Sequence, residues 1–183
     1  MRQIVLASGS PRRHELLKYI AAEFEIMPSD IEEIAEGSPT EQVVKLALDK
    51  ASDIAAKRPD AVVIGADTLV AIGDTIFGKP QDKSDAADML RKLSGKTHSV
   101  FTGIAVANDG EEEARCVETT VTFCEMSDIE IEEYIETGEP MDKAGAYGIQ
   151  GYGGKFIDKI DGCYFNVMGL PQSTMYDMLR KYL

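Results

Sequence analysis

Short apolar runs alternate with amphipathic helical patterns along the chain, and this alternation predicts a sheet covered by helices. The run from Ile4 to Ala7 is typical of a strand, and the spacing from Arg13 to about Ala22 indicates a helix. Phe24 to Met27 predicts a second short strand, which ends at Pro28. The acidic stretch from Ser29 to Gly37 follows neither pattern, so we expect a loop there.

A strong helix start follows at Ser38. Ser38 has the place of an N-cap, Pro39 suits the first helical position and Glu41 completes a capping box. The helix is expected to run to about Lys57 on an apolar stripe of Val43, Val44, Ala47, Leu48, Ala51, Ile54 and Ala55. At about 100° per residue, Lys50 lies on the border of this stripe. Its side chain either points into the interior or a cleft, or snorkels toward solvent.

The rest of the chain mixes hairpins with strand–helix units. Ala61 to Gly65 predicts a buried strand, and Asp67 and Thr68 come directly after it, where α/β sheets place their ligand crevices. The other predicted elements are a hairpin of Leu69 to Ile72 with Thr75 to Phe77, a helix from Ser84 to Leu93, long strands from His98 to Val106 and Arg115 to Phe123, a helix that starts at the capping box of Ser127 and Glu130 and closes at Gly138, a final hairpin of Lys155 to Ile160 with Tyr164 to Val167, and a helix from Pro171 to Leu183. This mixture predicts an α/β protein with a mixed sheet, built as a single domain over residues 1–183 with two lobes.

The charge of the chain limits its partners. The 183 residues include 32 acidic and 19 basic side chains, which give a net charge of −13. This charge repels nucleic-acid backbones and anionic membranes, so neither partner is expected. No apolar run approaches the roughly 20 residues that a membrane span needs, and the N-terminal run is too short for a signal peptide, so we expect a cytoplasmic protein.

Several residue types are not expected to carry chemistry. The three cysteines, Cys116, Cys124 and Cys163, are odd in number and lack C-x-x-C spacing, which suggests neither a disulfide framework nor a zinc site. We expect them to be reduced packing residues. His14 is expected on a helix surface and His98 at the start of a strand.

The segment from Ser8 to Arg13 has the layout of an anion site. Ser8 and Ser10 offer hydroxyls, Gly9 allows close backbone approach, and a helix that opens at Pro11 presents unpaired N–H groups. The guanidinium groups of Arg12 and Arg13 match phosphate oxygens. The alternative is an ordinary capped turn with solvated arginines.

Three further patches suit a triphosphate. They are the acidic stretch from Asp30 to Glu33, the predicted strand end at Asp67, and the long loop from Glu139 to Gly151. Basic side chains would neutralise phosphate, and carboxylates would hold a hard cation or deprotonate the attacking water. Long loops within small domains are usually functional or disordered, and the interleaved Ala, Tyr and Ile favour order here.

A series of short motifs, in a fixed order along the chain, carries a family resemblance. They are LASGSPRR (Leu6 to Arg13), the carboxylate near Glu33, LALDKA (Leu46 to Ala51), GADT (Gly65 to Thr68), GKP (Gly78 to Pro80), LSGKTHSVFTG (Leu93 to Gly103), EPMDKAGAYGIQG (Glu139 to Gly151) and NVMGLP (Asn166 to Pro171). Over essentially its whole length the chain resembles the Maf proteins, nucleoside triphosphate pyrophosphatases once described as septum formation inhibitors. The resemblance implies an inosine triphosphatase-like fold, with a long bent mixed β-sheet and two lobes around a central cleft. It also implies hydrolysis of a nucleoside triphosphate to the monophosphate and pyrophosphate, with Mg²⁺ or Mn²⁺ as cofactor.

The resemblance also assigns residues. Asp67 would be the catalytic acid group, as proton acceptor or metal ligand, and Glu33 would assist at the metal. The phosphates would be held by Ser8, Arg13, Lys50 and Lys79, and the base would be selected by Arg12, Thr68 and Gln150. The family branch with Arg12, Thr68 and AYGIQG at these places acts on dTTP and UTP. A glutamine amide can pair with the carbonyl and N–H edge of thymine or uracil, although Gln150 could equally be a surface amide.

Some points depart from this pattern or leave alternatives. Glu32 is adjacent to Glu33 and could be the family carboxylate instead, Cys163 stands where a polar residue is expected, and Gly153-Gly154 predicts an unusually flexible loop. The alternatives for function are a non-catalytic nucleotide-binding regulator of cell division and a pyrophosphatase for purine or 7-methyl-GTP nucleotides. The resemblance makes a homodimer plausible.

Overall fold

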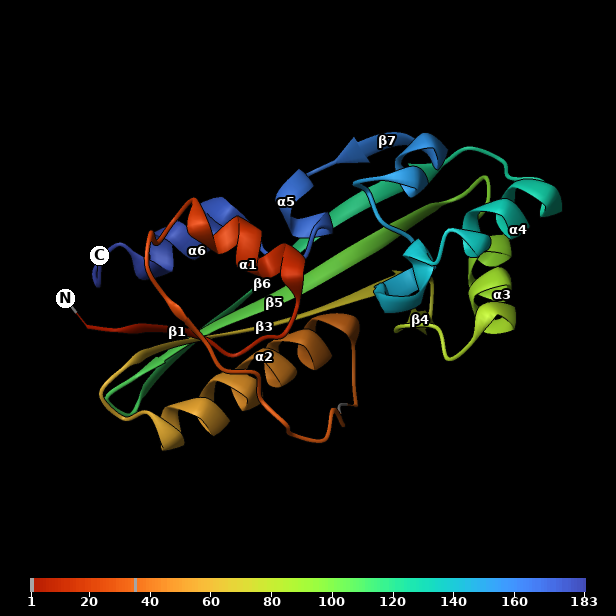
Figure 1. Ribbon diagram of the computed structural model, residues 1–183. Coiled ribbons are helices and arrows are strands. Elements are labelled where there is room, and N and C mark those ends of the chain that lie inside the picture. The colour runs from red at the N-terminus through yellow and green to blue at the C-terminus, as the bar shows by residue number, and fades with distance from the viewer. Residues whose placement is uncertain (1, 35) are drawn as a thin grey trace. The chain divides into compact units, whose positions relative to one another are not determined.

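The strands of the chain form one mixed sheet. The computed structural model describes residues 2–34 and 36–183, and within them seven strands pair in the order β2-β1-β3-β5-β6-β7, with β4 beside β3 (Figure 1). β1 pairs parallel with β2 and β3, whereas β3 with β4 and β6 with β7 are antiparallel. The strands are β1 (Ile4–Leu6), β2 (Glu25–Ile26), β3 (Val62–Ile72), β4 (Thr75–Phe77), β5 (Thr97–Asn108), β6 (Glu111–Phe123) and β7 (Ile157–Asp161). The predicted α/β fold with a mixed sheet is confirmed.

The helices include short 3-10 turns in the late loop. The α-helices are α1 (Pro11–Lys18), α2 (Pro39–Lys57), α3 (Lys83–Leu93), α4 (Asp128–Glu136), α5 (Tyr164–Val167) and α6 (Gln172–Leu179), and the 3-10 helices are η1 (Glu139–Asp142), η2 (Ala144–Ala146) and η3 (Tyr152–Phe156). Both predicted capping boxes are confirmed, Ser38 with Glu41 and Ser127 with Glu130. Gly138 ends α4 in the left-handed region, at φ 75°.

The chain divides into two compact units, and the boundaries fall within β3, β5 and β6 and between α5 and α6. The first comprises the residues up to Thr68, Thr102–Val117 and Gly169–Leu183; the second comprises Leu69–Phe101 and Glu118–Met168. In the first unit, α2 lies on one face of the sheet and α1 and α6 lie on the other (Figure 1). One core cluster of this unit consists of Val5, Ala7, Ala47, Ala51, Ile54, Ala61, Val63, Ala105 and Ala107. The core of the second unit consists of Val70, Phe77, Ala86, Leu90, Leu93, Val100, Val121, Phe123, Ile131, Tyr134, Ile135, Ala146, Tyr147 and Phe156.

Two glycines let α2 lie directly on the sheet. A Cβ on Gly65 would overlap the carbonyl oxygen of Ala47 and lie 2.9 Å from the nitrogen of Ala51. A Cβ on Gly103 would likewise overlap the carbonyl of Val43. Because these positions lack side chains, the helix backbone packs against the strands without an intervening layer. This contact fixes the height of α2 above β3.

Several sequence expectations are corrected by the structure. The strand β3 continues to Ile72, so Asp67 lies within it and not after its end. The neighbouring strand β1 pairs with β3 only as far as Ile64. Asp67 therefore lies beyond the end of β1, and this end produces the sheet edge that was expected after β3. Tyr164–Val167 is a short helix and not a strand; β7 pairs with β6, and Asn166 of the short helix donates its amide to the Val100 carbonyl. Cys124, expected to pack, is exposed.

Candidate active site

Lys50 holds two carboxylates from different elements. It lies on α2 and is 8% exposed, which confirms that it points inward. Its Nζ lies 2.7 Å from Oδ1 of Asp67, on β3, and 2.6 Å from Oε1 of Glu33, in the loop before α2. Two carboxylate oxygens therefore converge on one ammonium group. Of the two adjacent acids, Glu33 is the one whose ion pair with this group is seen among the described residues.

The guanidinium of Arg13 donates hydrogen bonds to three segments: the turn at Ser8, the residues on either side of Asp67 in β3, and Gly169. Its Nε donates to the Gly169 carbonyl (2.9 Å), its Nη1 to the carbonyl of Ala66 (2.9 Å) and to Oγ of Ser8 (3.2 Å), and its Nη2 to Oγ1 of Thr68 (3.0 Å). Four of its five N–H groups thus bind the protein itself, within the part of the chain that the structure describes. Arg13 therefore orients the groups around Asp67, and among the described residues one of its N–H groups has no hydrogen-bond acceptor.

The charges around Arg13 act in opposite directions. Burial lowers the pKa of its guanidinium most strongly, the Asp67 carboxylate raises it, Arg12 lowers it and Glu33 raises it. Arginine has an ordinary pKa above 12, so it stays charged. The cluster therefore contains two arginines, one lysine and two carboxylates that interact electrostatically.

The turn before α1 leaves donors available for an anion. The Oγ of Ser8 accepts from the Ser10 N–H and from Arg13, so among the described residues its own O–H remains available to donate. Ser10 is the N-cap of α1 but makes no side-chain cap hydrogen bond, and the first turn holds no acid. A helix N-terminus without an acidic cap favours a bound anion.

The hydroxyl of Thr68 is held in place by two neighbours. It accepts from Arg13 and lies 3.0 Å from Oγ1 of Thr102, while the residue as a whole is half-buried. His14 was expected on the helix surface, but it is half-buried and its Nε2 lies 2.7 Å from the Ser8 carbonyl oxygen. Sequence reasoning thus missed two groups that support the site, Thr102 and His14.

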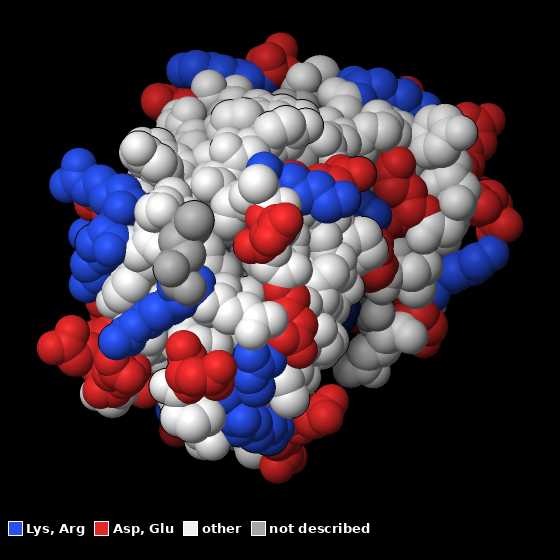
Figure 2. Space-filling view, turned by 60° about the vertical axis from the view of Figure 1, so that its left-hand side comes forward, with Lys and Arg blue, Asp and Glu red and all other residues white. Residues whose placement is uncertain are grey.

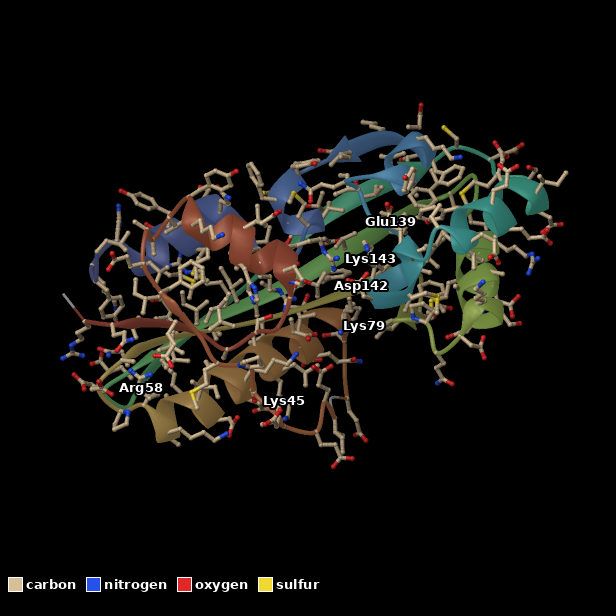
Figure 3. All side chains as sticks on the ribbon, viewed as in Figure 1. Lys45, Arg58, Lys79, Glu139, Asp142 and Lys143 are labelled. Atoms are coloured by element: carbon tan, nitrogen blue, oxygen red, sulfur yellow. The ribbon has the colours of Figure 1, made fainter. Side chains whose placement is uncertain are left out.

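Two predicted site residues, Lys79 and Gln150, belong to the second unit. Both are exposed; Lys79 follows β4, and Gln150 lies in the late loop between η2 and η3. The Gly78 carbonyl accepts from Gly145, which places the Lys79 segment against this loop (Figure 3). The first unit brings together Ser8, Arg13, Glu33, Lys50, Asp67 and Thr68, and Arg12 is adjacent on α1. The second unit holds Lys79 and Gln150, and the hydrogen bond from Gly145 to Gly78 joins the Lys79 segment to the loop that carries Gln150.

The residues fit a hard divalent cation that also binds phosphate. No group of three or more His, Cys, Asp and Glu side chains suited to a metal occurs within residues 2–34 and 36–183. Mg²⁺ usually binds one or two carboxylates together with substrate phosphates and waters, and not an all-protein cage. Asp67 and Glu33, whose oxygens already converge, match that donor set.

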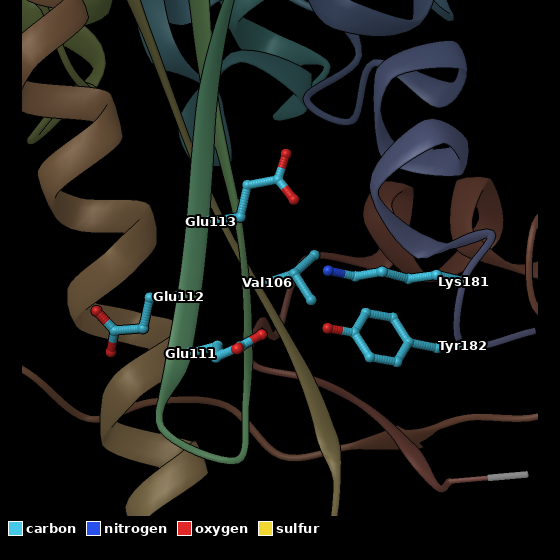
Figure 4. A pocket seen from close by; sticks show the side chains of 6 residues that line it. All are labelled: Val106, Glu111, Glu112, Glu113, Lys181 and Tyr182. Atoms are coloured by element: carbon cyan, nitrogen blue, oxygen red, sulfur yellow. The ribbon is translucent and has the colours of Figure 1, made fainter.

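A separate cavity lies at the tip of the β5–β6 hairpin in the first unit. Its volume is about 390 Å³, and its lining consists of Val106, Glu111, Glu112, Glu113, Lys181 and Tyr182 (Figure 4). Three glutamates against one lysine repel a triphosphate, and none of the predicted site residues lines this cavity.

On the face drawn in Figure 2, acidic and basic side chains are interspersed.

Comparison with known proteins places the chain in a family. The sequence profile described as "Maf-like protein" matches residues 3–182. The chain belongs to the Maf family. Proteins named dTTP/UTP pyrophosphatase in Bacillus pumilus and Desulforamulus reducens are 54% and 49% identical to it, over 100% of this chain and 97% of each relative.

The structural comparison agrees with the fold assigned to this Maf chain. The Ham1 protein of Staphylococcus aureus is 16% identical, with a TM-score of 0.54 over 100% of both chains. This likeness concerns the fold and supports the predicted inosine triphosphatase-like class. No helix in the described residues of the chain is long and apolar enough to cross a membrane.

Proposed function

We propose that the chain is a nucleoside triphosphate pyrophosphatase that hydrolyses dTTP and UTP to the monophosphate and pyrophosphate. The observation that carries this proposal is the convergence of Asp67 and Glu33 on Lys50, next to the donors of Ser8 and Arg13. Carboxylates beside phosphate-binding cations are the groups that water-dependent phosphoryl chemistry needs. The relatives at 54% and 49% identity carry the name of this activity.

The residues have separate tasks in this reaction. Asp67 accepts the proton of the attacking water as the new phosphorus–oxygen bond forms and the bridging bond to pyrophosphate breaks. Lys50, Lys79 and the remaining N–H of Arg13 neutralise phosphate charge, and the Ser8 hydroxyl donates to a phosphate oxygen. Mg²⁺ or Mn²⁺, held by Asp67 and Glu33, would neutralise charge on the phosphate oxygens.

Base selection falls to Arg12, Thr68 and Gln150. The Gln150 amide offers one acceptor and two donors, which can pair with the O4 and N3–H edge of uracil or thymine. The Thr68 hydroxyl has a fixed direction because Arg13 and Thr102 hold it.

We also propose that the enzyme is cytoplasmic, that it acts on free nucleotides without a nucleic-acid partner, and that it forms a homodimer.

The test is pyrophosphate release from dTTP, UTP, CTP, ITP, ATP and 7-methyl-GTP with Mg²⁺ or Mn²⁺. We expect dTTP and UTP to be turned over fastest, and Asp67→Asn to lose this activity. Asp74→Asn, on the exposed turn between β3 and β4, is the matched control and should retain it. Preference for ITP or 7-methyl-GTP would indicate a purine enzyme, and binding without turnover would indicate a regulator.

A further inference from the structure

The carboxylate of Glu139, at the start of the loop that carries Gln150, binds the other end of that loop. Its Oε1 accepts from the Tyr134 hydroxyl (2.8 Å) and from the Gly153 N–H (3.0 Å), and its Oε2 accepts from the Tyr152 N–H (2.8 Å). Glu139 begins η1, whereas Tyr152 and Gly153 begin η3, so one side chain closes the segment between them. Three donors on one carboxylate form a strong, directional arrangement.

Tyr134 extends this network to the middle of the loop. Its side chain is buried, and its hydroxyl donates to Glu139 while accepting from the Gly148 N–H at 3.0 Å. Burial raises the pKa of Tyr134, so the phenol keeps the proton that it donates. The backbone is therefore held two residues before Gln150 and two residues after it.

The glycines around Gln150 serve close approach and not flexibility. A Cβ on Gly153 would lie 2.5 Å from the Tyr134 hydroxyl and 2.6 Å from the Gly148 carbonyl oxygen. Gly151 has φ 89°, and a Cβ there would overlap Oε2 of Glu139. The expectation that Gly153-Gly154 loosens the loop is wrong at Gly153, because this residue is buried against Tyr134 and hydrogen-bonded to Glu139.

A lysine secures the first turn of the same loop. Lys143 Nζ donates to the Glu139 carbonyl and to Oδ1 of Asp142, each at 2.6 Å (Figure 3). Glu139 is thus held through its main chain as well as through its side chain. Polar contacts thus hold the loop at both of its ends and at Gly148, and Gln150 is exposed on it.

We propose that Glu139 is a specificity-determining positioning residue, which sets base selection by fixing the backbone from which Gln150 presents its amide. This inference rests on the proposed function, since it assigns Gln150 to the base. Glu139 itself touches neither base nor phosphate in this account. Its effect is on the geometry of a recognition group, and small displacements of such groups reduce discrimination.

The test compares Glu139→Gln with wild type on UTP and CTP, which differ at the base edge. The amide nitrogen of Gln would face N–H donors, so part of the network is lost without a change in volume. We expect KM and Kd for UTP to rise about 10-fold, kcat to change less than about 3-fold, and the UTP:CTP ratio of kcat/KM to fall about 10-fold. Glu136→Gln, an exposed carboxylate on α4, is the control and should change none of these.

A double-mutant cycle separates positioning from general stability. In a Gln150→Ala background, Glu139→Gln should change the UTP:CTP ratio of kcat/KM less than about 2-fold, because the Gln150 amide through which Glu139 acts has been removed. Tyr134→Phe keeps the ring packing, removes the hydroxyl and should reproduce the loss of discrimination if Glu139→Gln is poorly folded. A uniform fall in kcat for both nucleotides, or additive effects with Gln150→Ala, would overturn the inference.

The binding measurement keeps this result separate from the proposed function. If wild type binds UTP but does not hydrolyse it, the proposed function fails, while the ratio of Kd for UTP and CTP still tests Glu139. If wild type hydrolyses UTP and the ratio is unchanged in Glu139→Gln, only the role of Glu139 fails.

Discussion

Nζ of Lys50 lies 2.7 Å from Oδ1 of Asp67, and both side chains are largely shielded, at 10% and 13% exposure. Bringing two such charges out of water costs several kcal/mol per ion, which their attraction offsets only with good geometry. A pair of apolar residues at these positions would stabilise the fold as well. The Lys50–Asp67 pair is therefore better explained by the roles of the two groups in binding and cleaving a phosphate.

Replacing Lys50 with methionine should separate metal binding from turnover. Lys50→Met leaves Asp67 and Glu33 converging on an apolar side chain of similar length, without a counter-charge. We expect Mn²⁺ to bind the nucleotide-free protein about 10-fold more tightly, or about 1.4 kcal/mol, while pyrophosphate release falls because a phosphate-neutralising cation is lost. Titration calorimetry with Mn²⁺ measures the first effect.

The control for this variant is Lys45→Met on the same helix. Lys45 is exposed and pairs with Asp49 one turn away (Figure 3). Such surface pairs contribute little, so neither metal affinity nor turnover should change. Equal Mn²⁺ affinity in wild type and Lys50→Met would mean that the two carboxylates do not form a cation site.

The close contact of α2 with β3 predicts a large effect from one methyl group. In Gly65→Ala the new Cβ meets the Ala47 carbonyl and must push the helix outward. Overpacking should lower the free energy of unfolding by about 3 kcal/mol, which exceeds the gain of up to about 1 kcal/mol from a stiffer unfolded chain. Urea unfolding checks this, and Gly78→Ala, with open space around its Cβ, should change the free energy little.

Arg13 should not tolerate lysine. A lysine ammonium cannot reproduce the four hydrogen bonds that the guanidinium makes to Ser8, Ala66, Thr68 and Gly169. Leaving some of these acceptors unpaired should cost about 2–4 kcal/mol of unfolding free energy in Arg13→Lys. Arg180→Lys, at an exposed position, should cost less than about 0.5 kcal/mol. Thermal and urea unfolding measure both variants. If Arg13→Lys and Arg180→Lys lowered the unfolding free energy equally, the role given to Arg13 would be contradicted.

His98 should make stability depend on pH. Its ring is buried between Phe123 and Tyr147, its Nε2 lies 2.8 Å from the Tyr147 hydroxyl, and burial lowers the pKa of His98 to about 4. Because the unfolded chain takes up the proton near pH 6.5 and the folded chain only near pH 4, stability is full above pH 6.5 and is lost as the pH falls between these values. The expected loss from pH 7 to pH 5 is about 2 kcal/mol.

The matched variant for this effect is His98→Gln, whose side chain does not titrate. Urea unfolding at pH 7 and pH 5 should show a pH-dependent loss that is about 2 kcal/mol smaller than in wild type, with the other ionisable groups common to both. The same pH dependence in both proteins would show that His98 does not titrate between the folded and unfolded states in this way.

Local signals made much of the fold predictable. The capping boxes at Ser38 and Ser127 depend on residues three positions apart, and both were predicted from the sequence. The angular position of Lys50 on its helix was equally local. Tyr164–Val167 was misread because a short apolar run does not distinguish a strand from a helix, and its tertiary contacts, such as that from Asn166 to the Val100 carbonyl, are with residues distant in sequence.

The supporting contacts of the site were less predictable, because they use backbone groups. Arg13 donates to the carbonyls of Ala66 and Gly169, and Glu139 accepts from the N–H groups of Tyr152 and Gly153. Any residue type offers these groups, so no pattern of side chains marks them. The sequence therefore indicated Arg13 as a phosphate ligand, whereas its geometry makes it mainly an orienting group.

Asp67 is expected to support cleavage of a pyrimidine triphosphate to monophosphate and pyrophosphate. The most direct measurement is ³¹P NMR of the products from dTTP and Mg²⁺ with wild type and with Asp67→Asn. We predict dTMP and pyrophosphate in equal amounts from wild type, and a rate at least about 100-fold lower in the variant. Formation of dTDP and phosphate, or an undiminished rate in Asp67→Asn, would contradict the account.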